Sequence, residues 1–174
     1  ETEIIIHFLD VSKPEDQAKL DASILLPGGV IGSDGGTWQV GGAPVQQDAW
    51  PLPEDAWSHP RSAGTYARFL RQYVRENKSV TLMEAIERIS YGPAKMLEDS
   101  VPQMKQKGRI QVGADADIVV FDITTVSDRA TYAKPAQTSE GFHHIIVNGV
   151  LLVEDGTLNT NIMPGRAIRN EQVN

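Results

Sequence analysis

A single aspartate, Asp34, stands between glycines in the stretch Gly32-Ser33-Asp34-Gly35-Gly36. A lone carboxylate after an apolar run can act as a general base or lie beside a metal ion, and the glycines would let backbone and ligand approach it closely. The same residues also form a good tight turn, because Asp and Gly are both favoured in turns. The residue types alone leave both interpretations open.

A second candidate group, His59-Pro60-Arg61, comes just before an amphipathic stretch. The planar guanidinium of Arg61 is suited to a forked contact with a substrate carboxylate. The alternative is a pair of surface charges near the start of a helix. Sequence spacing does not decide between these two interpretations.

The elements expected before and after Asp34 are those of an α/β unit. Residues 4–8 (IIIHF) and 30–32 are predicted to be short strands, the second ending at Ser33-Asp34. Residues 13–21 are predicted to be a polar-faced helix with Ser12 as its N-cap and Pro14 in its first turn. Residues 35–60 form a long loop with three tryptophans, and long loops of this kind are commonly functional lids.

Two helices are expected after this loop, at residues 64–76 and 82–97. The first has one apolar face with helical spacing, made by Tyr66, Phe69, Leu70, Tyr73 and Val74. The second begins with Thr81 and Glu84 in capping-box spacing. Its predicted buried stripe consists of Leu82, Ala85, Ile86 and Ile89, and Gly92-Pro93 ends or kinks it.

The remainder of the chain is predicted to be rich in strands. Residues 109–112 and 118–121 are expected strands, separated by a turn at residues 113–117. Two β-branched runs flank Asn148-Gly149, the pair that favours a type I′ turn, so a hairpin is predicted there.

The bulk composition excludes several classes of protein. The 174 residues carry a net charge of −7 and no cysteine, which excludes disulfide scaffolds, cysteine-based zinc sites and thiol nucleophiles in this chain. No Lys/Arg stripe is present to meet phosphates, so nucleic acid is not an expected partner. No apolar segment is long enough to span a bilayer, and we expect no membrane association and a cytoplasmic location, with the periplasm as the alternative.

A resemblance to a known family favours the chemical interpretation of Asp34. The run GSDGG, HPRSAGTYARFLRQYVRE and LMEAIERISYGPAKML resembles the end of the catalytic domain of N-acyl-D-amino-acid deacylases, which belong to the amidohydrolase superfamily. GRIQVGADADIVVFD, IIVNGVLLVEDG and PGRAIR resemble the segment that follows it. The resemblance implies an α/β plus β fold. Residues 1–107 would form the last strand–helix units of a TIM-like (β/α)8 barrel, and residues 108–174 part of a small β-sandwich.

The resemblance also implies roles for individual residues. Asp34 matches an aspartate beside a bound zinc ion, where it would take a proton from water and hand it to the departing amine. Arg61 matches the arginine that binds the substrate α-carboxylate, with His59 and Ser33 as further substrate-binding candidates. The implied reaction is metal-assisted hydrolysis of N-acyl-D-amino acids. The loop between Asp34 and Arg61 looks longer than is expected for the family, which leaves the substrate's identity open.

Most of the metal ligands that the family needs are missing from this chain. Its four histidines, His7, His59, His143 and His144, show no His-x-His spacing. The adjacent pair at 143–144 would point to opposite faces of a strand, and His7 is expected to be a core histidine. We therefore expect the chain to be the C-terminal portion of a larger hydrolase. It would be inactive alone and would pack against the N-terminal remainder as a second chain, with most zinc ligands on that remainder.

Two alternatives remain at this point. One is another amidohydrolase, of the dihydroorotase-like or hydantoinase-like type that opens cyclic amides. The other is a non-catalytic, β-rich interaction subunit. An Arg61 that faces away from Asp34 would remove the support for a substrate with a free carboxylate.

Overall fold

The computed structural model describes residues 9–46 and 48–168, so the predicted strand at 4–8 and His7 lie outside the described residues. The helical elements are α1 (Pro14–Ile24), α2 (Arg61–Phe69), η1 (Leu70–Glu76), α3 (Leu82–Ile86), η2 (Glu87–Tyr91), α4 (Gly92–Leu97) and η3 (Pro102–Gln106). The strands are β1 (Gln39–Val40), β2 (Ala43–Pro44), β3 (Ile118–Phe121), β4 (Phe142–Val147), β5 (Val150–Glu154) and β6 (Thr157–Leu158). Within the described residues, every helix is too short or too polar to span a bilayer.

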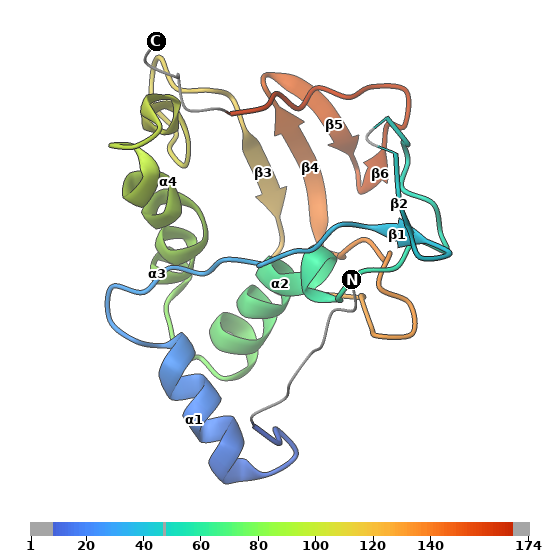
Figure 1. Cartoon of the computed structure of the whole chain (residues 1–174). Helices are drawn as coiled ribbons and strands as arrows, with labels where there is room; N and C mark the ends of the chain where they lie inside the picture. The colour runs from blue at the N-terminus through green and yellow to red at the C-terminus, as the bar shows by residue number, and fades with distance from the viewer. Residues whose placement is uncertain (1–8, 47, 169–174) are drawn as a thin grey trace.

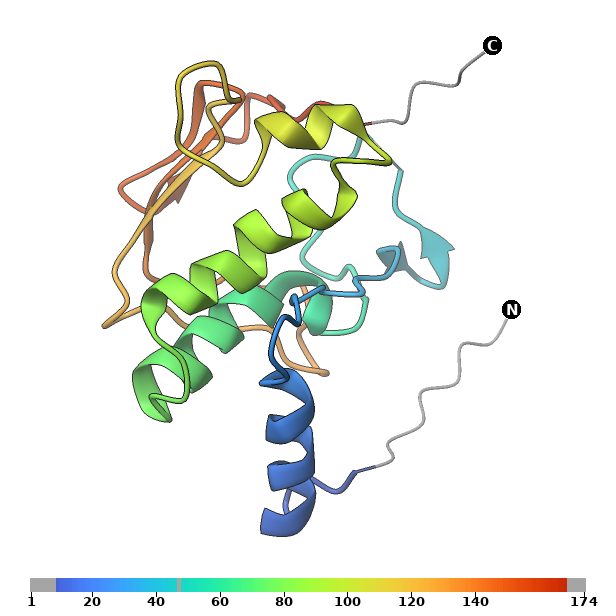
Figure 2. The same ribbon diagram turned by 90° about the vertical axis from the view of Figure 1, so that its left-hand side faces the viewer.

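The helices gather on one side of the molecule and the larger sheet on the other (Figure 1). Among the described residues, this sheet has the order β3-β4-β5-β6 with antiparallel neighbours, and β1 pairs with β2 in a separate small ribbon. After a quarter turn, α2 and the continuous helical stretch from α3 to α4 run side by side (Figure 2). An extended segment leads from α1 across the face of the helices to β1 (Figure 1).

The hydrophobic core lies where the helices meet the base of the sheet. Buried residues from α2, η1 and α3 pack with Val126, which follows β3. Phe121 and Phe142, at the facing ends of β3 and β4, close this core from the sheet side. Described residues on both sides of the predicted domain boundary, in 1–107 and in 108–174, therefore share one core. The boundary at residue 107 stays a prediction.

The structure confirms the predicted helices and the hairpin, and local contacts account for both. Thr81 Oγ accepts a hydrogen bond from Glu84 N–H, and the Glu84 carboxylate accepts one from Thr81 N–H, which is the expected capping box. Asn148 and Gly149 have φ angles of 48° and 78°, as a type I′ turn between β4 and β5 requires.

The detailed burial of the helices differs from the prediction in two places. Tyr66 is exposed on α2, while Ala67 is buried. The reason is that α2 turns its small residues toward the segment after β3, where a Cβ added at Gly64 would lie 3.1 Å from Asp128 Cβ. Leu82 is also exposed, because it is the first residue of α3 and lies at the end of that helix.

The N-cap of α1 is another correction. Lys13 occupies the N-cap position, without a side-chain hydrogen bond, and Pro14 begins the helix as expected. The Ser12 hydroxyl instead donates to Asp10 Oδ1 at 2.6 Å, because the short loop before the helix forms its own local turn.

Two predicted strands are absent from the described residues. Residues 30–32 are not a strand; the Ile31 N–H donates to the Arg88 carbonyl of η2 and no neighbouring strand lies beside it in the described chain. Residues 109–112 are not a strand either, and Ile110 is 88% exposed. Both sequences have β-type side chains, but a strand needs a paired neighbour to satisfy its backbone groups.

Candidate functional site

Asp34 lies in a turn rather than at the end of a strand. Its φ angle is 45°, a left-handed conformation that Asp and Asn tolerate better than other residues with side chains. The side chain is 90% exposed. Beside it, Ser33 Oγ accepts a hydrogen bond from Gly35 N–H at 3.3 Å, so Ser33 stabilises the turn in this structure.

The structure brings Asp34 and Arg61 together although 27 positions separate them. Arg61 Nη2 lies 2.8 Å from Asp34 Oδ2, and Arg61 Nε donates to the Asp34 main-chain oxygen at 2.6 Å. The guanidinium thus binds the carboxylate and the peptide of one residue at once, which fixes the orientation of the turn. Among the described residues, Nη1 makes no hydrogen bond, and it can meet a further acceptor.

The glycines after Asp34 let the turn approach the start of α2. A Cβ added at Gly35 would lie 3.4 Å from Ser62 Cα, and one at Gly36 would lie 3.4 Å from Ser58 Oγ. Gly36 N–H donates to Ser62 Oγ at 3.1 Å, and this hydroxyl lies 2.9 Å from that of the buried Ser58. The turn after Asp34 therefore packs in close contact with the residues at the start of α2.

Ser58 and Ser62 were not among the predicted site residues. Ser58 lies near the end of the long loop and Ser62 lies in the first turn of α2, and their paired hydroxyls join this end of the loop to Gly36 at its beginning. The sequence signal for them was the pair of serines on either side of His59-Pro60-Arg61.

His59 lies at the start of α2, next to Arg61. Its Nδ1 accepts the Arg61 main-chain N–H at 3.1 Å, so the ring satisfies one of the unpaired donors of the helix N-terminus. Its Nε2 lies 3.0 Å from the hydroxyl of Tyr132, a residue from the segment between β3 and β4. Sequence reasoning did not select Tyr132, because no local pattern shows that these distant residues meet.

The loop between Asp34 and Arg61 is held at its base. Gln39 and Trp57 exchange two main-chain hydrogen bonds of 2.9 and 2.7 Å, and β1 and β2 form a small ribbon beyond them. The described residues of the loop are therefore held by main-chain hydrogen bonds rather than free of contacts, as its tryptophans indicated.

The described residues do not by themselves form a zinc site. They contain no cluster of three or more His, Asp or Glu side chains that could hold a metal ion. His144 Nε2 lies 3.7 Å from an Asp155 carboxylate oxygen, while His143 is exposed, so this pair offers no joint site. One carboxylate, Asp34, falls short of the three or four ligands that a protein zinc site uses.

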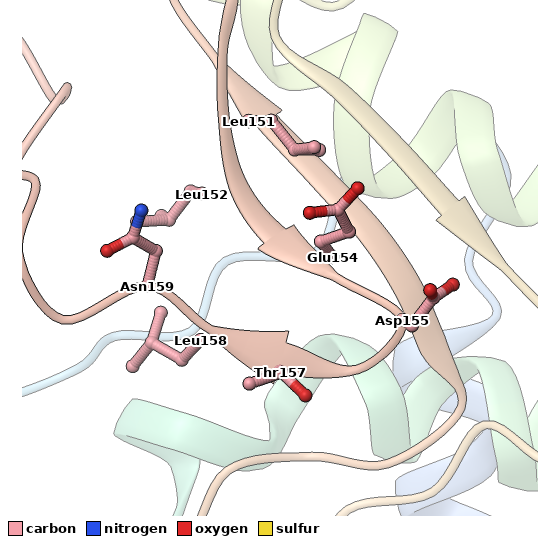
Figure 3. A pocket seen from close by; sticks show the side chains of 7 residues that line it. All are labelled: Leu151, Leu152, Glu154, Asp155, Thr157, Leu158 and Asn159. Carbon is pink, nitrogen blue, oxygen red and sulfur yellow. The ribbon is translucent and has the colours of Figure 1, made fainter.

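Two surface hollows lie elsewhere on the sheet. One, of about 350 Å³, is lined by residues of β5 and β6 and their connection, including Glu154 and Asp155 (Figure 3). The other, of about 360 Å³, lies between Trp50 of the long loop, strands β4 and β5, and residues 162–165. Neither is lined by Asp34, Arg61, His59 or Ser33.

Comparison with known proteins gives one family. The model of the amidohydrolase family matches residues 43–153. An N-acyl-D-glutamate deacylase of Alcaligenes xylosoxydans xylosoxydans is 39% identical over 102 residues, which are 59% of this chain and 20% of that protein.

Solved structures agree with this result. A D-aminoacylase structure aligns with a TM-score of 0.55 and 32% identity, over 74% of this chain and 23% of its own. The N-acyl-D-glutamate deacylase of Bordetella bronchiseptica, complexed with zinc and a phosphonate inhibitor, aligns with a TM-score of 0.57 and 35% identity, over 80% of this chain and 25% of its own. The chain thus spans between a fifth and a quarter of the length of these relatives.

Proposed function

Because the chain belongs to the amidohydrolase family, we propose that it is the C-terminal portion of a metal-dependent enzyme that hydrolyses the amide bond of N-acyl-D-amino acids. The relatives that support this substrate class are an N-acyl-D-glutamate deacylase and a D-aminoacylase. In the longer enzyme, residues 1–107 would complete a barrel and residues 108–174 a β-sandwich. The rest of that protein, as the same or a second chain, would cover the faces that are exposed here.

The observation that carries the proposal is the ion pair between Asp34 and Arg61. A carboxylate and a guanidinium 2.8 Å apart combine a proton acceptor with a binding group for a carboxylate. A substrate that has both a scissile amide and a free α-carboxylate fits this pair, whereas a cyclic amide that lacks a carboxylate would leave the arginine without a partner on the substrate.

In the proposed reaction, Arg61 binds the substrate α-carboxylate through Nη1 while Nε holds the Asp34 peptide. This fixes the distance between the amide and the Asp34 carboxylate. Asp34 accepts the proton of the attacking water and then gives it to the amine nitrogen as the amide bond breaks. Zinc, bound by ligands outside this chain, would supply polarisation of the acyl carbonyl.

Replacement of Asp34 by Asn in the complete enzyme tests the proposal. We expect kcat/KM for N-acetyl-D-glutamate to fall by about 10²- to 10⁴-fold, the usual contribution of a general acid–base group. The melting temperature should stay close to that of the wild type, because Asn also tolerates the left-handed backbone at this position.

The matched control is Asp55→Asn, at an exposed aspartate of the same loop, which should leave the rate unchanged. Full activity in Asp34→Asn would leave Asp34 as a turn residue only and would refute its assigned role. A folded wild-type enzyme that does not hydrolyse N-acyl-D-amino acids would refute the substrate class.

A further inference from the structure

Tyr132 contacts His59, next to Arg61, from a segment that is remote in the sequence. Residues 127–140 leave the end of β3 and return to β4, and their two ends are joined by main-chain hydrogen bonds between Ser127 and Glu140 of 3.1 and 2.8 Å. This excursion lies against the first turns of α2. Figure 1 shows it in orange below the sheet, next to α2.

Side-chain contacts hold the excursion in place on α2 and η1. Asp128 forms an ion pair with Arg71 at 2.9 Å, with only 12% of its side chain exposed. Ser139 Oγ donates to the Ala63 main-chain oxygen at 3.3 Å. Gly64 supplies the space for this approach, since a Cβ there would lie 3.1 Å from Asp128 Cβ.

A tight turn within residues 127–140 places Tyr132 next to His59. Thr131 and Lys134 exchange main-chain hydrogen bonds of 3.1 and 3.2 Å, and Thr131 Oγ1 accepts a further bond from Lys134 N–H. The Tyr132 hydroxyl lies 3.0 Å from His59 Nε2, and the two rings meet edge to face with centroids 5.1 Å apart.

The contact with Tyr132 holds the orientation of the His59 ring, and the bond from the Arg61 N–H sets its tautomer. Because Nδ1 accepts the Arg61 N–H, the neutral ring carries its hydrogen on Nε2 and donates it to the Tyr132 oxygen. The chain of contacts runs from Tyr132 through His59 to the main chain of Arg61, and from the Arg61 guanidinium to Asp34.

We propose that Tyr132 is a positioning residue for the Arg61 guanidinium, acting through His59. This inference rests on the proposed function, in which Arg61 binds the substrate α-carboxylate. A ring held by Tyr132 keeps the first residue of α2 in one orientation, so the guanidinium meets the substrate without further ordering. Loss of the hydroxyl should therefore weaken substrate binding more than it slows the chemical step.

The first experiment measures KM and kcat separately for Tyr132→Phe in the complete, zinc-loaded enzyme. We expect KM for N-acetyl-D-glutamate to rise about three- to tenfold, the effect of one lost hydrogen bond, and kcat to change less. Tyr66→Phe, at another exposed tyrosine that lies on α2 itself, is the matched control and should leave both constants unchanged.

The second experiment tests the path through His59. His59→Asn places an amide oxygen where it can still accept the Arg61 N–H, but the shorter side chain ends before Tyr132. This variant should reproduce the rise in KM of Tyr132→Phe, and the double variant should be no worse than either single one.

Three results would overturn the inference while leaving the proposed function intact. These are an unchanged KM in Tyr132→Phe, a loss confined to kcat, and effects of the two substitutions that multiply. Absence of turnover in the folded wild-type enzyme is a different result. It refutes the proposed function and, with it, the role assigned to Arg61.

Discussion

The Arg61 guanidinium holds Asp34 in place and, in the proposed function, also binds the substrate carboxylate. Its Nε and Nη2 already bind Asp34, at 2.6 Å to the main-chain oxygen and 2.8 Å to the carboxylate. The two donors therefore keep the left-handed turn of Asp34 in place, while Nη1 makes no hydrogen bond within the described residues. A lysine has the same charge but lacks the fixed fork, so it cannot bind both partners in this way.

We expect Arg61→Lys in the complete enzyme to raise KM for N-acetyl-D-glutamate about 10- to 100-fold, as for a lost hydrogen bond between charged groups. Steady-state kinetics measure this change. Arg68→Lys, at an exposed arginine of α2, is the control and should behave like the wild type. An unchanged KM in Arg61→Lys would show that this residue does not bind the substrate carboxylate.

At this scale, sequence reasoning selected the groups with distinctive chemistry and missed those that position them. Asp34, Arg61 and His59 were chosen by residue type and by resemblance, and the structure brings them together. Their chemical roles stay predictions. Ser62 and Tyr132 could not be chosen, because their relevance depends on how the long loop and the excursion after β3 return to α2.

At the scale of elements, the string GADADIVVFD has a structural role in this chain. Asp117 Oδ1 accepts the Asn148 N–H at 2.7 Å, and its other oxygen pairs with Lys107. Burial by itself raises the pKa of Asp117, but the bond from Asn148 and the Lys107 ammonium outweigh it and hold that pKa below the ordinary value. One carboxylate thus joins the turn before β3 to the hairpin turn between β4 and β5.

A lowered pKa in the folded protein gives a defined dependence of stability on pH. The charge of Asp117 stabilises the fold above its unfolded pKa, near 3.8, and this contribution is lost as pH falls through the lower folded pKa. We expect Asp117→Asn to lower the free energy of unfolding by about 0.5–1 kcal/mol at pH 7, as for partly exposed ion pairs.

Thermal unfolding followed by circular dichroism at several pH values measures this difference. The melting temperatures of wild type and Asp117→Asn should converge at acid pH, whereas Asp99→Asn, at an exposed aspartate, should match the wild type throughout. A gap that stays constant from neutral to acid pH would contradict the assigned charge effect.

Local signals predicted the elements that local contacts can form, and they were less successful where a neighbour is required. The capping box at Thr81 and the turn at Asn148 each depend on residues that are adjacent or nearly so. Residues 30–32 and 109–112 have the side chains of strands, but a strand exists only where a second backbone pairs with it. In the described residues neither stretch has such a partner.

At the scale of the whole molecule, the chain spans only a small part of the length of its relatives. It spans about a quarter of the Bordetella bronchiseptica relative. Apolar side chains that would ordinarily be covered, including Met83, Met96 and Ile110, are exposed. Exposure of this kind is costly, at about 25 cal/mol per Å² of apolar surface, and under the proposed function the rest of a longer enzyme would cover these faces.

Residues 109–112 test whether the rest of a longer enzyme covers the apolar side chains that are exposed here. In the complete enzyme, we expect them to pair as a strand with a segment outside this chain, because Ile110 and Val112 are β-branched, are fully or almost fully exposed here, and come shortly before β3 in the sequence. Amide hydrogen exchange measured by mass spectrometry should then be slow for this peptide in the complete enzyme and fast in the 174-residue chain.

The β4–β5 hairpin, which is already paired in this chain, is the internal control and should exchange slowly in both. Equally fast exchange at 109–112 in both proteins would mean that the stretch is a loop in the enzyme as well, and that the missing part of the fold covers other faces.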